Sequence, residues 1–309
     1  MEFYLIFLAF ILSTLLHIIV QNFFVKRNYF DDFNHRTSHK TEATRSGGVS
    51  IFSSLFFISI LHYFLKIELF DYSLFIPLGI LFTIGAYDDL YQADFKIKFL
   101  MQLIVAKILI DQGFTISSLH GFLGIYEIPW IFSQLITTIT FIIIVNAYNF
   151  IDGVDGLAIS ETVKNLCFFL YILSQDDPLY NLGFLLLFIC IPFYFFNFKK
   201  DRKIFLGDAG SLFLGGVNII FLLHILNTNV ILSNLNHINK VLLSFAILSY
   251  PLLDLTRVVI IRIKNKKSLF TADQNHLHHW LISKNFSHLN ITFLIISLGS
   301  ILLLTISLV

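Results

Sequence analysis

Charged residues are scarce in this chain and account for 13% of its 309 residues. Soluble domains carry about 25%, so this sequence has too little charge to cover a globular surface in water. An intrinsically disordered protein is excluded as well, because 56% of the residues are hydrophobic and disorder requires a low share of apolar side chains. The composition predicts a polytopic integral membrane protein.

Cysteine and net charge are also low, and both narrow the range of functions. The two cysteines, Cys167 and Cys190, lie inside apolar runs, which argues against a disulfide or a cysteine-based metal framework. A net charge of +1 provides no overall attraction to nucleic acid. Because no repeat and no linker rich in proline or glycine interrupts the chain, we expect residues 1–309 to form a single membrane-embedded domain.

Long apolar runs dominate the sequence. A bilayer core about 30 Å thick is spanned by about 20 helical residues, and ten runs approach that length. We therefore predict an all-α fold with about ten transmembrane helices. They lie near residues 3–25, 47–65, 72–87, 97–112, 128–147, 157–174, 179–196, 209–228, 239–262 and 289–309.

The distribution of lysine and arginine predicts the orientation. These residues gather in the loops after the first, third, seventh and ninth predicted spans, and cytoplasmic loops retain an excess of both. The odd-numbered loops are therefore predicted to be cytoplasmic, and both termini to lie on the non-cytoplasmic side.

Acidic, amide and histidine side chains are placed mainly at the same cytoplasmic ends. Acidic residues at a membrane boundary are costly to desolvate and usually face a partner or a water-filled cavity. Adjacent acids alone can simply mark a solvated helix end, so the whole set matters more than any member. The set comprises Asp88, Asp89, the segment 146–156, Asp208 and the histidines of segment 276–279.

A polar stripe is predicted in segment 146–156, where amides and carboxylates recur at every third residue. Two carboxylates one turn apart repel each other unless a cation, a donor or a substrate lies between them. The adjacent Gly153 and Gly156 would let a ligand or another backbone approach closely. A polar helix end is the ordinary alternative, but the combination favours a functional site. The stripe consists of Asn146, Asn149, Asp152 and Asp155.

Two further segments offer binding groups. In Gly207-Asp208-Ala209-Gly210-Ser211, glycines at a helix start can expose backbone N–H groups to phosphate while the carboxylate holds Mg²⁺. Glycines that pack helices closely in lipid are the alternative.

In the segment 276–279, His276 and His279 would share a helix face and His278 would point away. Binding of a diphosphate or sugar is favoured over a zinc site or a surface patch, because cysteine is missing and basic residues lie nearby.

These segments resemble the polyprenyl-phosphate N-acetylhexosamine-1-phosphate transferases of glycosyltransferase family 4, which are related to the phospho-N-acetylmuramoyl-pentapeptide translocase. The motifs occur in the family's order, and the His-x-His-His form is similar to the N-acetylglucosamine-type branch. The matching segments are Ser46-Gly47-Gly48-Val49-Ser50-Ile51, Gly85-Ala86-Tyr87-Asp88-Asp89, 146–158, 205–215 and His276-Leu277-His278-His279.

The resemblance implies a reaction. Undecaprenyl phosphate attacks a UDP-N-acetylhexosamine, UMP leaves, and a lipid-linked diphospho-sugar starts a surface glycan such as the O-antigen of lipopolysaccharide. The enzyme would be a Mg²⁺-dependent phosphotransferase, with Mn²⁺ as an alternative ion. It would lie in the bacterial inner (plasma) membrane with a cytoplasmic active site, and a homodimer is left open.

The resemblance also implies roles for individual residues. Metal ligands would be Asp208 and Asp152. Asp88 and Asp89 would handle the lipid phosphate, one of them as a base or second metal contact. The nucleotide would be bound by Asn149, Asp152, Asp155 and, against the uracil, Phe205. Contacts to the diphosphate or sugar would come from His276, His278 and His279, and further substrate contacts from Lys40 and Arg45.

Two other classes fit less well. A cation-coupled transporter would place its carboxylates near mid-span, whereas these acids lie mainly at cytoplasmic ends. An alcohol phosphatidyltransferase would carry an Asp-Gly-x-x-Ala-Arg run, which the chain lacks.

Overall fold

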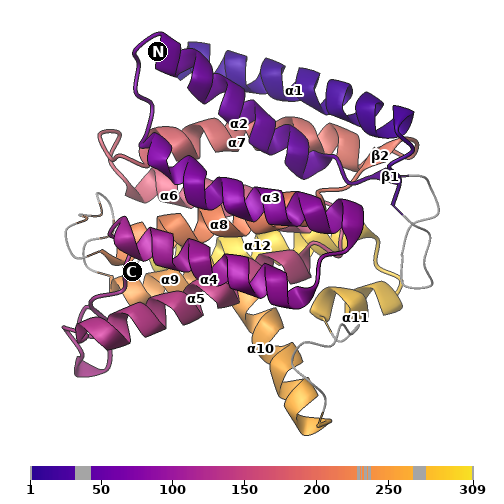
Figure 1. Ribbon diagram of the computed structural model, residues 1–309. Coiled ribbons are helices and arrows are strands. Elements are labelled where there is room, and N and C mark those ends of the chain that lie inside the picture. The colour runs from indigo at the N-terminus through magenta and orange to yellow at the C-terminus, as the bar shows by residue number, and fades with distance from the viewer. Residues whose placement is uncertain are drawn as a thin grey trace. The chain divides into compact units, whose positions relative to one another are not determined.

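The computed structural model describes residues 2–31, 43–227, 230, 232, 235, 238–266 and 276–307, so Lys40 lies outside the described residues (Figure 1). Nearly all regular structure in this part of the chain is helical. The elements in order are α1 (Glu2–Lys26), β1 (Ala43–Thr44), α2 (Gly47–Phe64), η1 (Tyr72–Leu74), α3 (Phe75–Tyr91), α4 (Phe95–Asp111), η2 (Phe122–Gly124), α5 (Trp130–Ile151), α6 (Leu157–Ile172), α7 (Tyr180–Asn197), β2 (Lys203–Ile204), α8 (Gly207–Leu226), α9 (Lys240–Ile247), α10 (Ser249–Lys264), α11 (Leu277–Ser283) and α12 (His288–Ser307).

A helix or a helix pair lies at each of the ten predicted spans, which confirms an all-α polytopic membrane protein. Seven helices in the described residues are long and apolar enough to cross a membrane, or eight if α9 and α10, bent by 76°, form one broken span. The helices α4 and α6 have 17 and 16 residues and are shorter than these. That all ten cross the bilayer, and on which side the termini lie, stay predictions.

The contacts within the chain divide it into two compact units. The first unit comprises Met1–Val105 and Phe169–Phe213, and the second comprises Ala106–Phe168 and Leu214–Val309. The single domain predicted for residues 1–309 stays a prediction.

In the first unit, α1 packs against α2 and α7, and the three helices lie side by side (Figure 1). The buried Ser13 hydroxyl donates to the Ile189 carbonyl at 2.7 Å and joins α1 to α7. The strands β1 and β2 pair in parallel, with Ala43 opposite Lys203. Beyond this pair the Gly47 N–H donates to the Phe205 carbonyl at 3.0 Å. The short sheet thereby places the start of α2 beside the start of α8.

In the second unit, a polar network lies inside the apolar helix packing. The Asn165 side chain donates to the Tyr148 hydroxyl at 2.7 Å and to the Asn218 side chain at 2.9 Å, and all three residues are buried. The buried Lys164 ammonium pairs with Glu161 and lies 3.4 Å from the Ile247 carbonyl, where α9 ends at the bend. A broken helix in a membrane protein needs such partners for its freed backbone groups.

Candidate active site

In the first unit, three carboxylates and two basic side chains gather where α3, α4 and α8 meet the start of α2. We call this group, Asp88, Asp89, Asp208, Arg45 and Lys98, the carboxylate cluster. The Lys98 ammonium lies 2.6 Å from Asp208 Oδ2 and 3.1 Å from Asp88 Oδ2. These three side chains are 18–24% exposed. Asp88 and Asp208 therefore direct one oxygen each toward a single, solvent-accessible cation.

Asp89 differs from its neighbour because its side chain is only 4% exposed. Its Oδ1 accepts the backbone N–H of Asp208, and its Oδ2 accepts that of Ala209, both at 2.9 Å. Asp89 is thus an N-terminal cap for α8, and its negative charge complements the helix dipole. These two N–H groups are occupied by the protein's own carboxylate, so the interpretation in which they bind phosphate is wrong.

Glycines make this close arrangement sterically feasible. Gly207 has φ +73°, and a Cβ at this position would lie 2.6 Å from Asp89 Oδ2. A Cβ on Gly48 would overlap the backbone of Gly210, and one on Gly85 would overlap the backbone of Asp208. The glycines in these motifs therefore serve close packing of α2 and α3 against the start of α8, as in the structural alternative above.

Arg45 links this cluster to the chain after α1. Its guanidinium lies 2.5 Å from Asp31 Oδ1 and 3.5 Å from Asp89 Oδ1. Burial opposes the charge of Arg45, but the neighbouring carboxylates of Asp31, Asp89 and Asp208 outweigh it and raise its pKa. Arg45, Asp31 and Asp89 also line a pocket of about 180 Å³. Asp31 was not singled out in the sequence, because its partners are distant along the chain.

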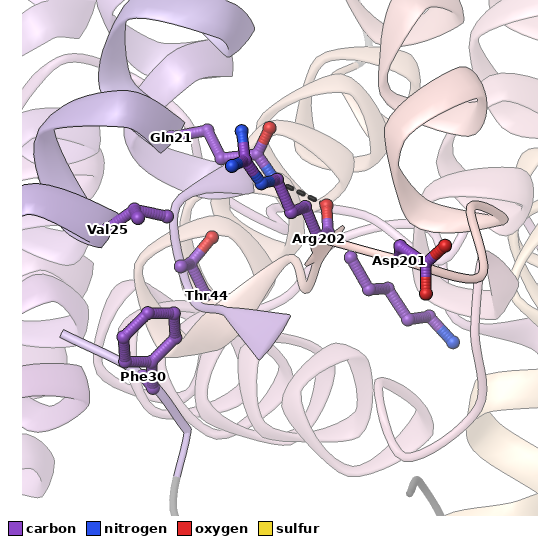
Figure 2. Close-up of a pocket in the computed structure, with 7 residues that line it drawn as sticks. Gln21, Val25, Phe30, Thr44, Asp201 and Arg202 are labelled. Carbon is purple, nitrogen blue, oxygen red and sulfur yellow. Dashed lines mark hydrogen bonds between the residues drawn. The ribbon is translucent and has the colours of Figure 1, made fainter. Parts of the chain in front are cut away.

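A larger pocket of about 350 Å³ lies beside the paired strands, and Figure 2 shows the residues that line it. Its wall is held by Gln21, whose side-chain amide donates to the Arg202 carbonyl. The ring of Phe205, the predicted uracil contact, is half-buried and lies 5.3 Å from the Lys203 ammonium. The pocket is lined by Gln21, Val25, Phe30, Thr44, Asp201, Arg202 and Lys203, none of which was a predicted site residue.

In the second unit, the predicted polar stripe is not a single helix face. The helix α5 ends at Ile151, and Asp152 is its C-terminal cap residue. Asn146 and Asn149 are therefore on α5, while Asp155 lies in the turn that follows. Gly156, directly before α6, has φ +72°, a conformation that glycine adopts without strain. The three-residue spacing is present in the sequence, but α5 ends within it, between Asn149 and Asp152.

The turn is held against α12. Asp155 Oδ2 lies 2.7 Å from His288 Nδ1, and the Asp155 carbonyl accepts the Thr292 hydroxyl at 2.9 Å. Gly153 in the same turn approaches the histidines, because a Cβ there would lie 3.0 Å from His278 Nε2. The structure thus brings the segment 152–156 together with the histidine segment.

The three histidines form one cluster, and His278 does not point away from it. His276 precedes α11 in an extended conformation. The His278 ring lies 5.3 Å from that of His276 and 4.5 Å from that of His279. His278 is fully buried, and burial together with the neighbouring His279 lowers its pKa to about 3. The prediction that His278 points away assumed that His276 is part of the helix, whereas α11 begins at Leu277.

Asp254 is a member of this cluster that the sequence analysis missed. It is 2% exposed, and its Oδ2 lies 2.7 Å from His276 Nδ1. Among the described residues, one potential ligand atom from each of Asp254, His276 and His278 lies within 4.8 Å of the others. An acid inside the apolar run 239–262 was the available signal, because such residues are rarely placed in a span without a partner.

The predicted site residues are thus distributed over both units. The first unit brings Asp88, Asp89, Asp208 and Arg45 into one cluster, and the second brings Asp155 close to the histidines. Asn149 is half-buried on α5. The predicted metal ligands Asp208 and Asp152 belong to different units, so their joint action stays a prediction.

Comparison with known proteins identifies the family. The model of glycosyl transferase family 4 matches residues 72–226, a range that includes the whole of α3, α5 and α8. A probable undecaprenyl-phosphate N-acetylglucosaminyl 1-phosphate transferase of Bacillus subtilis is 31% identical over 289 residues, covering 91% of this chain and 78% of the relative. This chain belongs to glycosyl transferase family 4.

Other relatives in glycosyl transferase family 4 carry similar names. A decaprenyl-phosphate N-acetylglucosaminephosphotransferase of Mycobacterium tuberculosis is 30% identical over 303 residues, covering 84% of this chain and 70% of the relative. An undecaprenyl-phosphate alpha-N-acetylglucosaminyl 1-phosphate transferase of Yersinia pestis is 26% identical over 287 residues, covering 90% and 76%. The resemblance inferred from the motifs is therefore confirmed, and the chain is a membrane-embedded transferase.

Proposed function

We propose that this protein transfers N-acetylhexosamine 1-phosphate from a UDP-sugar to undecaprenyl phosphate, with release of UMP. The first lipid-linked sugar of a surface glycan would be the product. The observation that supports this most strongly is the match to the Bacillus subtilis transferase across 91% of the chain. The carboxylate cluster, whose three acids lie in the motifs on which the resemblance was based, agrees with it. The names of these relatives make N-acetylglucosamine the sugar to test first.

The chemistry needs charge neutralisation more than a base. A phosphate monoester has a second pKa of about 6, so the lipid phosphate is already largely ionised at neutral pH. One of its oxygens attacks the β-phosphorus of the UDP-sugar, and the bond from that phosphorus to the bridging oxygen breaks. UMP leaves with the bonding electrons. Positioning and electrostatic stabilisation supply most of the rate in such transfers.

The carboxylate cluster suits a divalent ion. Asp88 and Asp208 each direct a carboxylate oxygen to one cation within 3.1 Å, and carboxylate oxygens are the ligands that Mg²⁺ prefers. When bound, the ion would neutralise the charge of the diphosphate. In the proposed reaction Asp88 and Asp208 hold it, with Asp152 as the further predicted ligand. Asp89 keeps the start of α8 in place, and Arg45 and Lys98 supply positive charge for phosphate oxygens.

The second unit would recognise the nucleotide sugar. His288 holds the Asp155 side chain at 2.7 Å, so this carboxylate has a defined orientation for a sugar or ribose hydroxyl. The half-buried Asn149 and Asp152 would contribute further polar contacts, and His279 would reach the diphosphate or sugar. The lysines and arginines at the odd-numbered loops support a cytoplasmic site in the plasma membrane, where UDP-sugars are available.

A reconstituted reaction tests this proposal. Purified protein in detergent is incubated with undecaprenyl phosphate, Mg²⁺ and a panel of UDP-N-acetylhexosamines, and UMP release and the lipid product are followed by mass spectrometry. We expect UMP release that requires the lipid, is abolished by EDTA and is fastest with one sugar. Folded protein that releases no UMP with any sugar, with or without EDTA, would contradict the proposed function.

A further inference from the structure

Asp254 has an unusual position for a charged side chain. It lies on α10 within a predicted span, its side chain is 1% exposed, and both of its oxygens are engaged. Oδ2 lies 2.7 Å from His276 Nδ1, and Oδ1 accepts the Leu277 N–H at 2.6 Å. Burying a carboxylate is costly unless it is well paired. This carboxylate therefore has a specific task at the start of α11.

The first consequence concerns the backbone. His276 is the N-cap residue of α11, but its own side chain makes no capping hydrogen bond. Asp254 accepts the N–H of the first helical residue in its place, and its negative charge suits the positive end of the helix dipole. One side chain on α10 thus determines where the histidine-bearing helix begins.

The second consequence concerns the ring of His276. A carboxylate at Nδ1 keeps a proton on that nitrogen and leaves Nε2 as the ring atom for another partner. The ring is further confined, because its centroid lies 5.5 Å from that of Phe150 and 5.3 Å from that of His278. The guanidinium of Arg262 lies over the same Phe150 ring at 5.9 Å. Asp254 therefore sets both the protonation pattern and the orientation of an immobilised imidazole.

A metal ion is the competing interpretation of this group. Asp254, His276 and His278 are close enough to share one, and His278 Nε2 is buried without a hydrogen-bond partner among the described residues. The 2.7 Å and 2.6 Å contacts of Asp254 are, however, ordinary charge-assisted hydrogen bonds. Both oxygens have protein donors without an ion, so the hydrogen-bonded pair is favoured.

We propose that Asp254 is a positioning residue: through His276 and the first N–H of α11, it orients the histidine segment for the diphosphate or sugar of the donor. This inference rests on the proposed function and adds to it a residue outside the segments on which the resemblance was based. Asp254 itself is not expected to touch the substrate.

The test is a double-mutant cycle in the purified enzyme. The variants are Asp254→Asn, His276→Asn and the double variant; asparagine is a good N-cap, and the amide oxygen that replaces the carboxylate can still accept the Leu277 N–H. We expect Asp254→Asn to lower kcat/KM for the UDP-sugar by about ten- to a hundredfold, the range for groups that orient a histidine. The KM for undecaprenyl phosphate should stay within about twofold. Because Asp254 acts through His276, adding Asp254→Asn to His276→Asn should cost less than about twofold more.

Asp71→Asn is the matched control. Asp71 also accepts a backbone N–H, from Ser73 at 2.9 Å, at the exposed start of η1, so its variant should keep full activity. Thermal unfolding in detergent and UMP binding check that each variant is folded. A merely structural role would lower the folded fraction and reduce the rates with both substrates equally.

Three outcomes would overturn the inference. The first is an Asp254→Asn enzyme within about twofold of the wild type. The second is a double variant whose loss equals the product of the single losses. The third is a protein-bound metal ion, detected by elemental analysis, that Asp254→Asn removes. A folded wild type that is inactive with every UDP-sugar would instead overturn the proposed function and, with it, the reaction for which His276 is positioned.

Discussion

The carboxylate cluster of the first unit and the histidine cluster of the second use charge in opposite ways. Asp88, Asp208 and Lys98 are each about one-fifth exposed, and solvent can replace a lost partner at little cost. Asp254 and His276 are at most 5% exposed, so loss of one partner leaves a buried polar group unsatisfied. The carboxylate cluster can therefore exchange Lys98 for another cation. The buried contact between Asp254 and His276 instead keeps both side chains in a fixed orientation.

The largest effect should follow from removing the charge at Asp208. Asp208→Asn takes away the carboxylate nearest to Lys98 and the proposed principal ligand of the divalent ion. We expect about a thousandfold loss of turnover, as for other groups that stabilise charge in a transition state. UMP release by purified protein measures it, and the exposed Asp176 provides the control Asp176→Asn. Near-normal activity of Asp208→Asn would contradict the metal assignment.

Asp88→Asn should be weaker, because Asp208 and Lys98 remain in contact. We expect a loss of about ten- to a hundredfold, within the usual range for one catalytic polar group. The Asp88 Oδ1 that accepts the Ala93 N–H at 2.8 Å has an equivalent acceptor in asparagine, so the end of α3 should stay intact. The same UMP assay, with the melting temperature as a check, measures the loss. Equal losses in Asp88→Asn and Asp208→Asn would show that Asp208 is not the principal ligand of the two.

Gly48→Ala tests the packing beneath the cluster. The added methyl group would overlap the Gly210 backbone, and overpacking of this kind costs about 1–3 kcal/mol. We expect a clearly lower melting temperature in detergent. Gly79→Ala is the control, since its nearest neighbour would be Phe52 at 3.9 Å, an ordinary contact distance. The two variants melting together would show that α2 and α8 are not in close contact here.

The smallest effect is expected for Lys98, whose ammonium is the cation between Asp88 and Asp208. Lys98→Met removes the ammonium that competes with a metal ion for Asp88 and Asp208, so Mn²⁺ should bind about fivefold more tightly, or about 1 kcal/mol for a partly exposed pair. Electron paramagnetic resonance titration without substrate measures this affinity. Lys107→Met is the control, because Lys107 pairs with Asp111 at an exposed site. Weaker Mn²⁺ binding in Lys98→Met would show that Lys98 does not compete.

The helices were predictable and the contacts between them were not. Each apolar run corresponds to a helix because lipid leaves a backbone few other ways to satisfy its hydrogen bonds. The stripe from Asn146 to Asp155 failed as a helix because α5 ends at Ile151, and a spacing of three residues does not reveal where a helix ends. The sequence did point to Asp88, Asp89 and Asp208 together, since their motifs were recognisable.

The roles of Asp89 and Asp254 could be assigned only from the structure. Asp89 looked equivalent to Asp88, yet it caps α8 through N–H groups more than a hundred residues away along the chain. Asp254 was not singled out within its predicted span, and only its contact with His276 reveals its role. Both are tertiary hydrogen bonds, and neither composition nor periodicity carries information about such pairs.

The backbone contacts at Gly48 and Gly85 have a consequence for sequence variation. At these two buried positions the neighbouring atoms belong to the main chain, and no substitution at the opposite residue removes main-chain atoms. A larger residue at either glycine therefore cannot be accommodated by a compensating change in the opposite side chain, and it would push the helices apart.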